Sequence, residues 1–151
     1  MSSNLEIAQA FFDKCEAGEG WDAVKSYCTP DATFRGQGGV FHPPAAPEPN
    51  LGGTLENYVN WMKMLYHDLT PGCYLTEVSK AYDSETRTAL FCGVFNGTHS
   101  KTPEGAPLPP PTNKTTSSDY VYSIHFNADG KIDKMVKIWN SEWAAKDFGW
   151  A

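Results

Sequence analysis

Two side chains that could do acid–base chemistry, Tyr122 and Lys137, lie in runs rich in aromatic and β-branched residues near the end of the chain. The segment 127–130 between these runs contains the Asp-Gly pair of a tight hairpin turn, which would place both side chains on paired strands. A lysine beside a phenol lowers the phenol's pKa, and a desolvated lysine becomes a better base or nucleophile. We therefore predict an acid–base or oxyanion-stabilising pair. The alternative is a core tyrosine beside a lysine whose ammonium reaches solvent.

Alternation along the strands sorts the other residues of this hairpin. If Tyr122 points inward, so do Tyr120 and Ile124, and Lys137 shares a face of the last strand with Met135 and Trp139. The outward face then carries Val121, His125, Val136 and Ile138. Both faces of the last strand are substantially apolar, as expected of a sheet covered on both sides. We predict a homodimer through the outer face of the sheet.

The histidines are further candidates for chemistry. His99 ends a long strand pattern within the Gly-Thr-His motif, and a neutral imidazole there could relay protons near pH 7. The alternative for His99 is a hydrogen bond to a loop carbonyl. His67 and Asp68 are adjacent in a helical pattern and do not face each other, so we expect local packing. His42 lies in a loop and receives no role.

Several aromatic side chains could line a cavity with Tyr122, although any of them could instead be core. The candidates for ligand binding are Trp61, Phe91, Phe95 and Trp139. Together these rings predict an apolar or aromatic small-molecule ligand. The sequence has neither a Gly-rich phosphate loop nor a dinucleotide fingerprint, so we expect a reaction without a cofactor.

Composition narrows the class of protein. The 151 residues suit one domain spanning 1–151, and the formal net charge of -6 argues against a nucleic-acid partner. The four cysteines form no C-x-x-C pair, so we expect no metal site and reduced thiols. Neither a signal peptide nor an apolar run of roughly 18 residues is present, which predicts a cytoplasmic protein without a membrane span.

The hydrophobic periodicities predict three helices followed by a run of strands. A capping box at Ser3 and Glu6 begins the first helix and Gly18 and Gly20 end it, while Thr54 caps the third helix and Pro71 ends it. The other expected elements are a helix at 21–28, strands at 32–35, 74–82, 87–99, 115–126 and 131–140, and a short helix or tail at 143–150. We expect an irregular lid or disordered loop at 36–53 and a pocket-rim loop at 103–112.

Four segments carry a family resemblance: 28–34 (Cys-Thr-Pro-Asp-Ala-Thr-Phe), 95–99 (Phe-Asn-Gly-Thr-His), 108–112 (Leu-Pro-Pro-Pro-Thr) and 129–132 (Asp-Gly-Lys-Ile). With these, the chain resembles the SnoaL-like, polyketide cyclase-like branch of the nuclear transport factor 2-like superfamily. The resemblance implies an α+β cone, with about three helices packed on a strongly curved antiparallel sheet. It also implies an apolar pocket, and frequently a dimer through the outer face of the sheet.

The family's catalytic carboxylates do not carry over to this chain. The base of ketosteroid isomerases falls at Gly36, and their oxyanion-stabilising acid falls at Tyr122, where a phenol could donate instead. The acid/base aspartate of the polyketide cyclases falls at Lys137 or Asn140. The resemblance therefore implies a cofactor-independent cyclase, isomerase or lyase acting on an apolar carbonyl compound through Tyr122, Lys137 and His99. The alternative is a non-catalytic ligand-binding or dimerisation module of the same fold.

Overall fold

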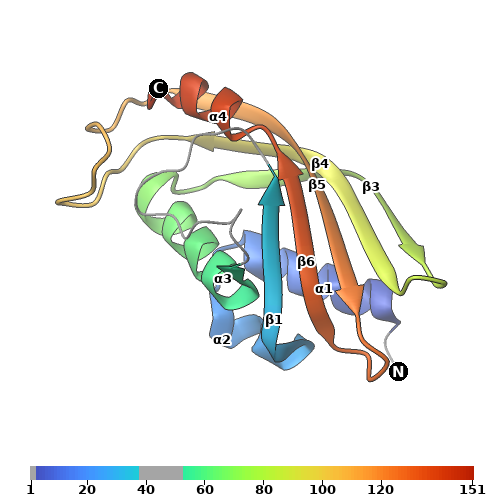
Figure 1. The fold of residues 1–151 in the computed structure, drawn as a ribbon. Coiled ribbons are helices and arrows are strands. Elements are labelled where there is room, and N and C mark those ends of the chain that lie inside the picture. The colour runs from blue at the N-terminus through green and yellow to red at the C-terminus, as the bar shows by residue number, and fades with distance from the viewer. Residues whose placement is uncertain (1–2, 38–52) are drawn as a thin grey trace.

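The computed structural model describes residues 3–37 and 53–151 (Figure 1). Its helices are α1 (Asn4–Glu16), α2 (Trp21–Val24), α3 (Leu55–Met64) and α4 (Ser141–Phe148), with a 3₁₀ turn at Lys25–Tyr27 and a π-helical turn at Leu65–Leu69. Its strands are β1 (Cys28–Gln37), β2 (Gly53–Thr54), β3 (Tyr74–Asp83), β4 (Thr88–Thr98), β5 (Thr115–Phe126) and β6 (Ile132–Trp139). Of the irregular loop expected at 36–53, residues 36–37 and 53 belong to β1 and β2 instead, because these ends pair in the sheet. The rest of that segment, with His42, lies outside the described residues.

The capping residues predicted from sequence begin and end the two long helices. Ser3 Oγ accepts from the Glu6 N–H at 3.2 Å, and the Ser3 N–H donates to the Glu6 carboxylate at 2.7 Å. Gly18 follows α1 with φ +72°, and a Cβ there would lie 2.6 Å from the Tyr66 side chain. Thr54 caps α3 by accepting from the Asn57 N–H at 3.1 Å. These local signals fix where α1 and α3 start, and therefore which of their residues face the sheet.

One six-stranded sheet has the order β2-β1-β6-β5-β4-β3. Its neighbours are antiparallel except β1 and β6, which run parallel, with Phe34 opposite Met135 and Gly36 opposite Lys137. The expectation of a wholly antiparallel sheet is therefore wrong at this pair. The two strands are separated by most of the chain, which leaves room for the long crossover that a parallel pair requires.

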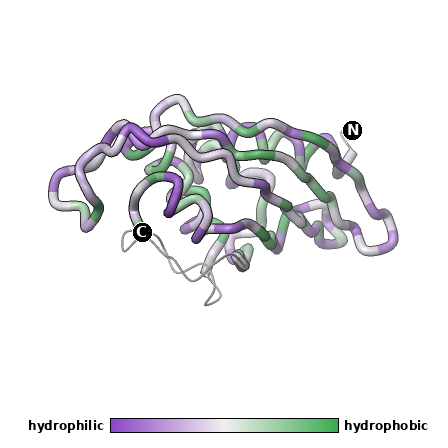
Figure 2. The backbone as a smooth tube through the Cα atoms, turned by 90° about the horizontal axis from the view of Figure 1, so that it is seen from above, coloured by the Kyte–Doolittle hydropathy of each residue, from purple (hydrophilic) through white to green (hydrophobic). Residues whose placement is uncertain are grey.

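The sheet curves over α1 and α3, and α4 lies where β6 ends (Figure 1). Along β5, buried residues alternate with exposed ones, so one face of the strand meets the helices and the other is outside. Figure 2 shows hydrophobic and hydrophilic residues interspersed along the strands, as this alternation requires. The interior between the helices and the inner face of the sheet is the place where a site can be built.

Three expectations about the elements need correction. The structure has a fourth α-helix at Ser141–Phe148, where a short helix or tail was expected, so about three helices is too few. The second helix ends at Val24 rather than at 28. Strand β1 begins at Cys28 and passes through Pro30, within a stretch where its register against β6 shifts. A proline fits such an irregular stretch because the regular ladder is interrupted there.

Candidate active site

Tyr122 and Lys137 lie directly opposite each other on β5 and β6, with both side chains on the inner face of the sheet. Tyr122 is 0% exposed and Lys137 is 8% exposed. The hairpin holds them there because its register pairs their two positions. A lysine this deeply buried is unusual, since moving its ammonium out of water is costly unless other groups compensate.

Two further side chains, Tyr58 from α3 and Glu16 from the last turn of α1, complete a buried polar cluster. The hydroxyls of Tyr58 and Tyr122 lie 2.6 Å apart. Lys137 Nζ donates to Tyr58 Oη at 3.3 Å, and Tyr58 Oη lies within donating distance of Glu16 Oε1 at 3.4 Å. One side chain from each of two helices, α1 and α3, and one from each of two neighbouring strands, β5 and β6, therefore meet in the interior. We call these four residues the interior cluster.

Aromatic rings surround the Lys137 ammonium. Its Nζ lies 4.4 Å from the ring centroid of Trp139, 5.3 Å from that of Tyr58 and 5.4 Å from that of Tyr122. Phe34 of β1 stacks on Tyr58, with centroids 4.1 Å apart and planes within 9°. Ring faces attract a cation and compensate part of its lost hydration. The rings also fix the position of Tyr58 beneath the ammonium.

Burial and charge pull the pKa values of Lys137 and Glu16 in opposing directions. Burial lowers the pKa of Lys137, and the carboxylate of Glu16 opposes that shift. Burial raises the pKa of Glu16, while the Lys137 ammonium and hydrogen bonds from the two phenols oppose that shift. Each group thus makes the ionised form of the other less costly. The balance leaves a lysine that releases its proton more easily and a carboxylate that binds one more readily.

The phenols respond in the direction opposite to our expectation. We expected Lys137 to lower the pKa of Tyr122, but burial and the nearby Glu16 raise the pKa of both Tyr122 and Tyr58 well above the usual range. The expectation was wrong because it took no account of burial, the largest cause of the rise, or of the Glu16 carboxylate in the same cluster. Both phenols therefore keep their protons near neutral pH and act as hydrogen-bond donors.

Some buried polar atoms have no hydrogen-bond partner among the residues that the structure describes. They are Glu16 Oε2, Thr29 Oγ1, Ser118 Oγ, Tyr120 Oη and Ser141 Oγ. Ser118 and Tyr120 alternate with exposed residues on β5 and share their face with Tyr122. Buried polar groups are normally paired, so Glu16 Oε2 in the cluster and Tyr120 Oη beside Tyr122 are atoms that a water or a ligand could satisfy.

His99 does not join the interior cluster. It is fully buried, and its Nδ1 accepts from the Thr112 N–H at 3.2 Å and from Trp150 Nε1–H at 3.1 Å. With Nδ1 an acceptor, the ring proton is on Nε2, which lies 2.8 Å from Thr102 Oγ1. We call these four residues the His99 knot. It ties the end of β4 to the following loop and to the C-terminal residues, whereas sequence analysis expected His99 at a pocket mouth.

Of the four predicted ligand-binding rings, Trp139 packs against the Lys137 ammonium, and Phe91 lies opposite Tyr122 on the neighbouring strand β4. Phe91 is fully buried and stacks on Phe12 of α1 at 4.9 Å between centroids. Phe95 is buried, and Trp61 packs partly buried against the core. The structure thus places Phe91, Phe95 and Trp61 in or against the hydrophobic core, and their role in binding stays a prediction.

Sequence analysis missed Glu16 and Tyr58, although a signal for each exists. Glu16 follows Phe12 by four residues and therefore lies on the apolar stripe of α1. Tyr58 precedes Met62 by four residues on the buried stripe of α3. Residues four apart share a helix face. A carboxylate or phenol in such a stripe is either costly or functional, and this spacing could have identified both residues.

Gly36 and Asn140 are two positions to which the resemblance assigned catalytic residues of the family, and the structure shows the neighbours of both. Gly36 of β1 lies beside Lys137 in the parallel pair and brings no functional group to it. Asn140 caps α4, because its side chain accepts from the Trp143 N–H at 2.9 Å. Asn140 therefore has a structural task at the end of β6. Of the two candidate positions, Lys137 belongs to the interior cluster.

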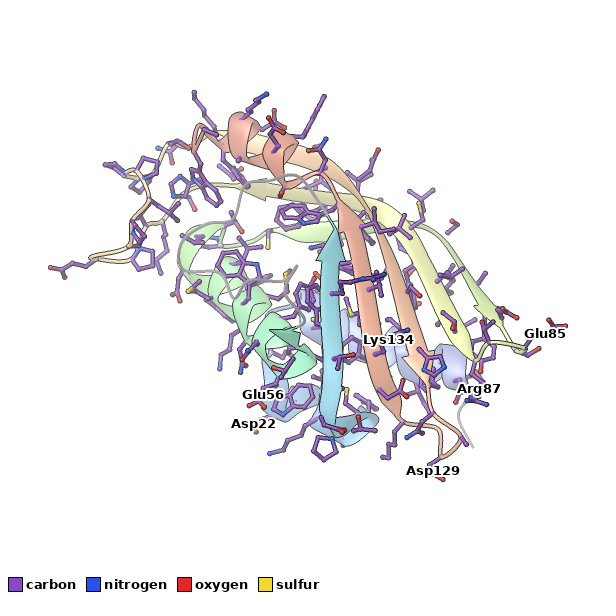
Figure 3. All side chains as sticks on the ribbon, viewed as in Figure 1. Asp22, Glu56, Glu85, Arg87, Asp129 and Lys134 are labelled. Atoms are coloured by element: carbon purple, nitrogen blue, oxygen red, sulfur yellow. The ribbon has the colours of Figure 1, made fainter. Side chains whose placement is uncertain are left out.

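The charged residues labelled in Figure 3 lie at the periphery, with Glu85, Arg87 and Asp129 at the turns that join strands. Within residues 3–37 and 53–151, no group of three or more His, Cys, Asp or Glu side chains is arranged to hold a metal ion. No helix in the same part of the chain is long and apolar enough to cross a membrane.

No family model and no curated protein matches the sequence, but solved structures do match the fold. IdmH from Streptomyces antibioticus, described as a proposed polyketide cyclase, gives a TM-score of 0.73 at 16% identity, covering 98% of this chain and 99% of that one. A proposed SnoaL-like polyketide cyclase from Jannaschia sp. CCS1 gives 0.70 at 15% identity, covering 96% and 90%. A proposed polyketide cyclase from Xanthomonas campestris gives 0.66 at 20% identity, covering 95% and 98%.

Other matching structures are described as nuclear transport factor 2-like and as having a ketosteroid isomerase-like fold. Identities this low speak for the fold and leave the chemistry to the site. The chain has the SnoaL-like, nuclear transport factor 2-like fold that its sequence motifs predicted.

Proposed function

We propose that this protein catalyses a cofactor-independent proton transfer on an apolar carbonyl compound, as a cyclase, isomerase or lyase. The observation that carries the proposal is the pair of buried phenols, with oxygens 2.6 Å apart, beside a buried lysine. Reactions that pass through an enolate need hydrogen-bond donors where negative charge develops on oxygen. Two protonated phenols in a water-poor interior meet that need.

Tyr122 and Tyr58 are the proposed oxyanion donors. Because burial keeps both phenols protonated, each can direct its O–H at a carbonyl oxygen that becomes an enolate oxygen. A substrate oxygen near the two hydroxyls would replace the hydrogen bond that they now share. Fixed donors in such a site need no rearrangement as charge develops, which is why they favour the transition state over the ground state.

Lys137 supplies positive charge to the same place. Its ammonium hydrogen-bonds Tyr58, so it polarises that phenol and strengthens it as a donor. The aromatic wall formed with Trp139 would hold the apolar part of the substrate. In this proposal Trp61, Phe91 and Phe95 shape the apolar surroundings, and His99 stabilises the fold away from the reacting atoms.

The decisive test is exchange of the C1 protons of 2-tetralone, an aromatic ketone, into D2O, followed by proton nuclear magnetic resonance. Tyr122→Phe removes a donor and keeps the shape of the ring. The exchange rate should fall roughly 10²–10³-fold, the usual cost of one oxyanion donor. Tyr74→Phe, at a tyrosine that is 61% exposed, is the matched control and should exchange at the normal rate.

Binding of 2-naphthol, which resembles the enol of 2-tetralone, separates catalysis from binding and can be followed by its fluorescence. Unaltered exchange in Tyr122→Phe would contradict the oxyanion role. If the unmodified protein binds 2-naphthol but does not accelerate exchange, the non-catalytic binding role replaces the proposed one.

We also propose that two copies pair through the outer face of the sheet. This face exposes Val78, Leu90, Val121 and Ile138, the first by 68% and the last by 53%. Val121 and Ile138 lie opposite each other on neighbouring strands, so they form one continuous apolar patch. Sedimentation should show a dimer at micromolar concentration, and Ile138→Lys should give a monomer. A monomer without the substitution would contradict the pairing.

A further inference from the structure

We infer that Glu16 is the general base of this site, the carboxylate that removes a proton from the carbon next to the substrate carbonyl. This inference rests on the proposed function and adds the residue that the proposal lacks. Enolate formation needs an acceptor for the carbon-bound proton as well as donors for the oxygen. The interior cluster has donors in its two phenols and its ammonium, and one carboxylate.

The hydrogen bonds of the cluster leave one acceptor unused. Lys137 has only N–H donors, and the two phenol oxygens are already engaged with each other. The two phenols and the Cys15 thiol act on the Glu16 carboxylate, and its Oε1 lies 3.4 Å from Tyr58 Oη. Its Oε2 is buried and forms no geometric hydrogen bond with the described residues. Burying a carboxylate oxygen without a hydrogen bond lowers the stability of the fold, and an apolar residue in this place would avoid that loss. A substrate proton would find its acceptor there.

The surroundings of Glu16 set its strength as a base. The titratable groups that interact with it are Cys15 on α1, Tyr58 on α3, Tyr120 and Tyr122 on β5, Lys137 on β6 and Cys73 just before β3. Burial raises the pKa of Glu16, which makes its carboxylate a stronger base than an exposed one. Lys137 keeps the carboxylate available by opposing that rise. The base and the oxyanion donors are thus tuned by the same buried cation.

The proposed step needs no other reactant. Glu16 takes the proton on the α-carbon, the C–H electron pair becomes a C=C bond, and the carbonyl π pair moves onto the oxygen that Tyr122 and Tyr58 hold. In an isomerisation, Glu16 returns the proton to a different carbon. In a cyclisation, the enolate carbon attacks a second carbonyl of the same molecule, and the new alkoxide takes the proton from Glu16. Atoms and charge balance in both cases.

The first experiment compares Glu16→Gln with Glu19→Gln, an exposed residue just beyond α1. Glutamine keeps the size of the side chain but cannot accept the proton. Deuterium exchange into 2-tetralone should fall roughly 10²–10⁴-fold in Glu16→Gln, the usual contribution of a general base. Binding of 2-naphthol should change less than about threefold, because the phenols that hold its oxygen remain. Glu19→Gln should match the unmodified protein in both.

The pH profile adds a readout that a structural role would not move. The rate should fall at low pH as Glu16 binds a proton, and this limb should be missing from the residual rate of Glu16→Gln. Carbon-13 resonance of the Glu16 carboxyl measures the same titration without substrate. In Lys137→Met its pKa should move upward, because the cation that opposes protonation is gone.

The outcomes separate the two proposals. If Tyr122→Phe loses exchange and folded Glu16→Gln keeps it, Glu16 is not the base and the proposed function stands. If Glu16→Gln loses 2-naphthol binding together with exchange, or if Glu16→Asp restores neither, the residue shapes the site and the assignment fails. Absence of exchange by the unmodified protein would reject the proposed function itself.

Discussion

The interior cluster and the His99 knot are both buried polar networks, yet they differ in how completely they are satisfied. In the knot, His99 uses both ring nitrogens, and its neighbours Thr102 and Thr112 donate onward to the Pro109 and Phe148 carbonyls at 2.8 and 2.6 Å. In the cluster, a carboxylate oxygen of Glu16 has no partner among the described residues. Satisfied networks hold a fold together, and incomplete ones are candidates for binding.

The two regions also differ in charge. The knot contains a neutral imidazole, whose protonation burial disfavours. The cluster holds an ammonium and a carboxylate together in the interior. Buried ion pairs contribute little to stability, because the loss of hydration offsets the attraction. We therefore expect the knot to govern stability and the cluster to govern activity, and three predictions test that division.

The largest expected effect is on activity in the cluster. Lys137→Met keeps an apolar stem of similar length but removes the charge that polarises Tyr58. Exchange into 2-tetralone should fall by roughly 10²-fold. The free energy of unfolding should fall by no more than about 1 kcal/mol, because Glu16, whose pKa burial already raises, can bind a proton once the Lys137 charge is gone. Urea denaturation and the exchange assay measure the two quantities. Lys134→Met, at an exposed position of the same strand, is the control for both. If Lys137→Met instead caused a large loss of stability and left exchange normal, the cluster would govern stability rather than activity, contrary to our expectation.

The next effect is on stability in the knot. His99→Ala removes the acceptor of the Thr112 N–H in a buried place, so the free energy of unfolding should fall by about 1–3 kcal/mol. Urea denaturation measures it. Exchange by the folded variant should stay within about threefold of normal. The proton relay that the sequence suggested for His99 requires the reverse, a large loss of exchange with little change in stability.

The smallest effect is a pH dependence of stability. Burial lowers the pKa of His99 in the folded protein below its ordinary value of 6.5, so the unfolded chain binds the proton more readily. The stability from neutral His99 is therefore complete above about pH 6.5 and is lost as the pH falls toward the folded pKa. Unfolding curves of the unmodified protein and His99→Ala should converge on acidification. Curves that stay parallel would show that His99 titrates normally.

Local signals in the sequence were sufficient for most of the fold. The capping box at Ser3, the Thr54 cap and the Asp-Gly turn at 129–130 each act within a few residues, so a sequence displays them directly. The parallel pairing of β1 with β6 was not predicted, because it depends on which strand from a distant part of the chain packs beside β1. Strand β2 is only two residues long, which is too short for a hydrophobic periodicity that would predict it.

Of the four residues in the interior cluster, the sequence pointed to two, Tyr122 and Lys137. Tyr122 and Lys137 emerged because alternation along a hairpin sorts its two faces. Glu16 and Tyr58 come from helices, and their meeting with the strands depends on how α1 and α3 pack. The pKa of Tyr122 was misjudged for the same reason, since its rise comes first from burial in the packed interior and then from Glu16, a carboxylate more than a hundred positions away.

The four residues of the interior cluster are far apart in the sequence, and this affects when the site can form during synthesis and folding. Its contacts join residues 42, 64 and 79 positions apart, and Lys137 lies on β6 between β1 and β5 in the sheet. Contacts of such long separation are slow to form, because a long stretch of chain must be closed before any of them is made. A ribosome therefore has to release the chain through β6 before the four side chains can meet. Truncation before β6 would leave α1, α2 and α3 but would remove α4 and Lys137, and with Lys137 the complete cluster.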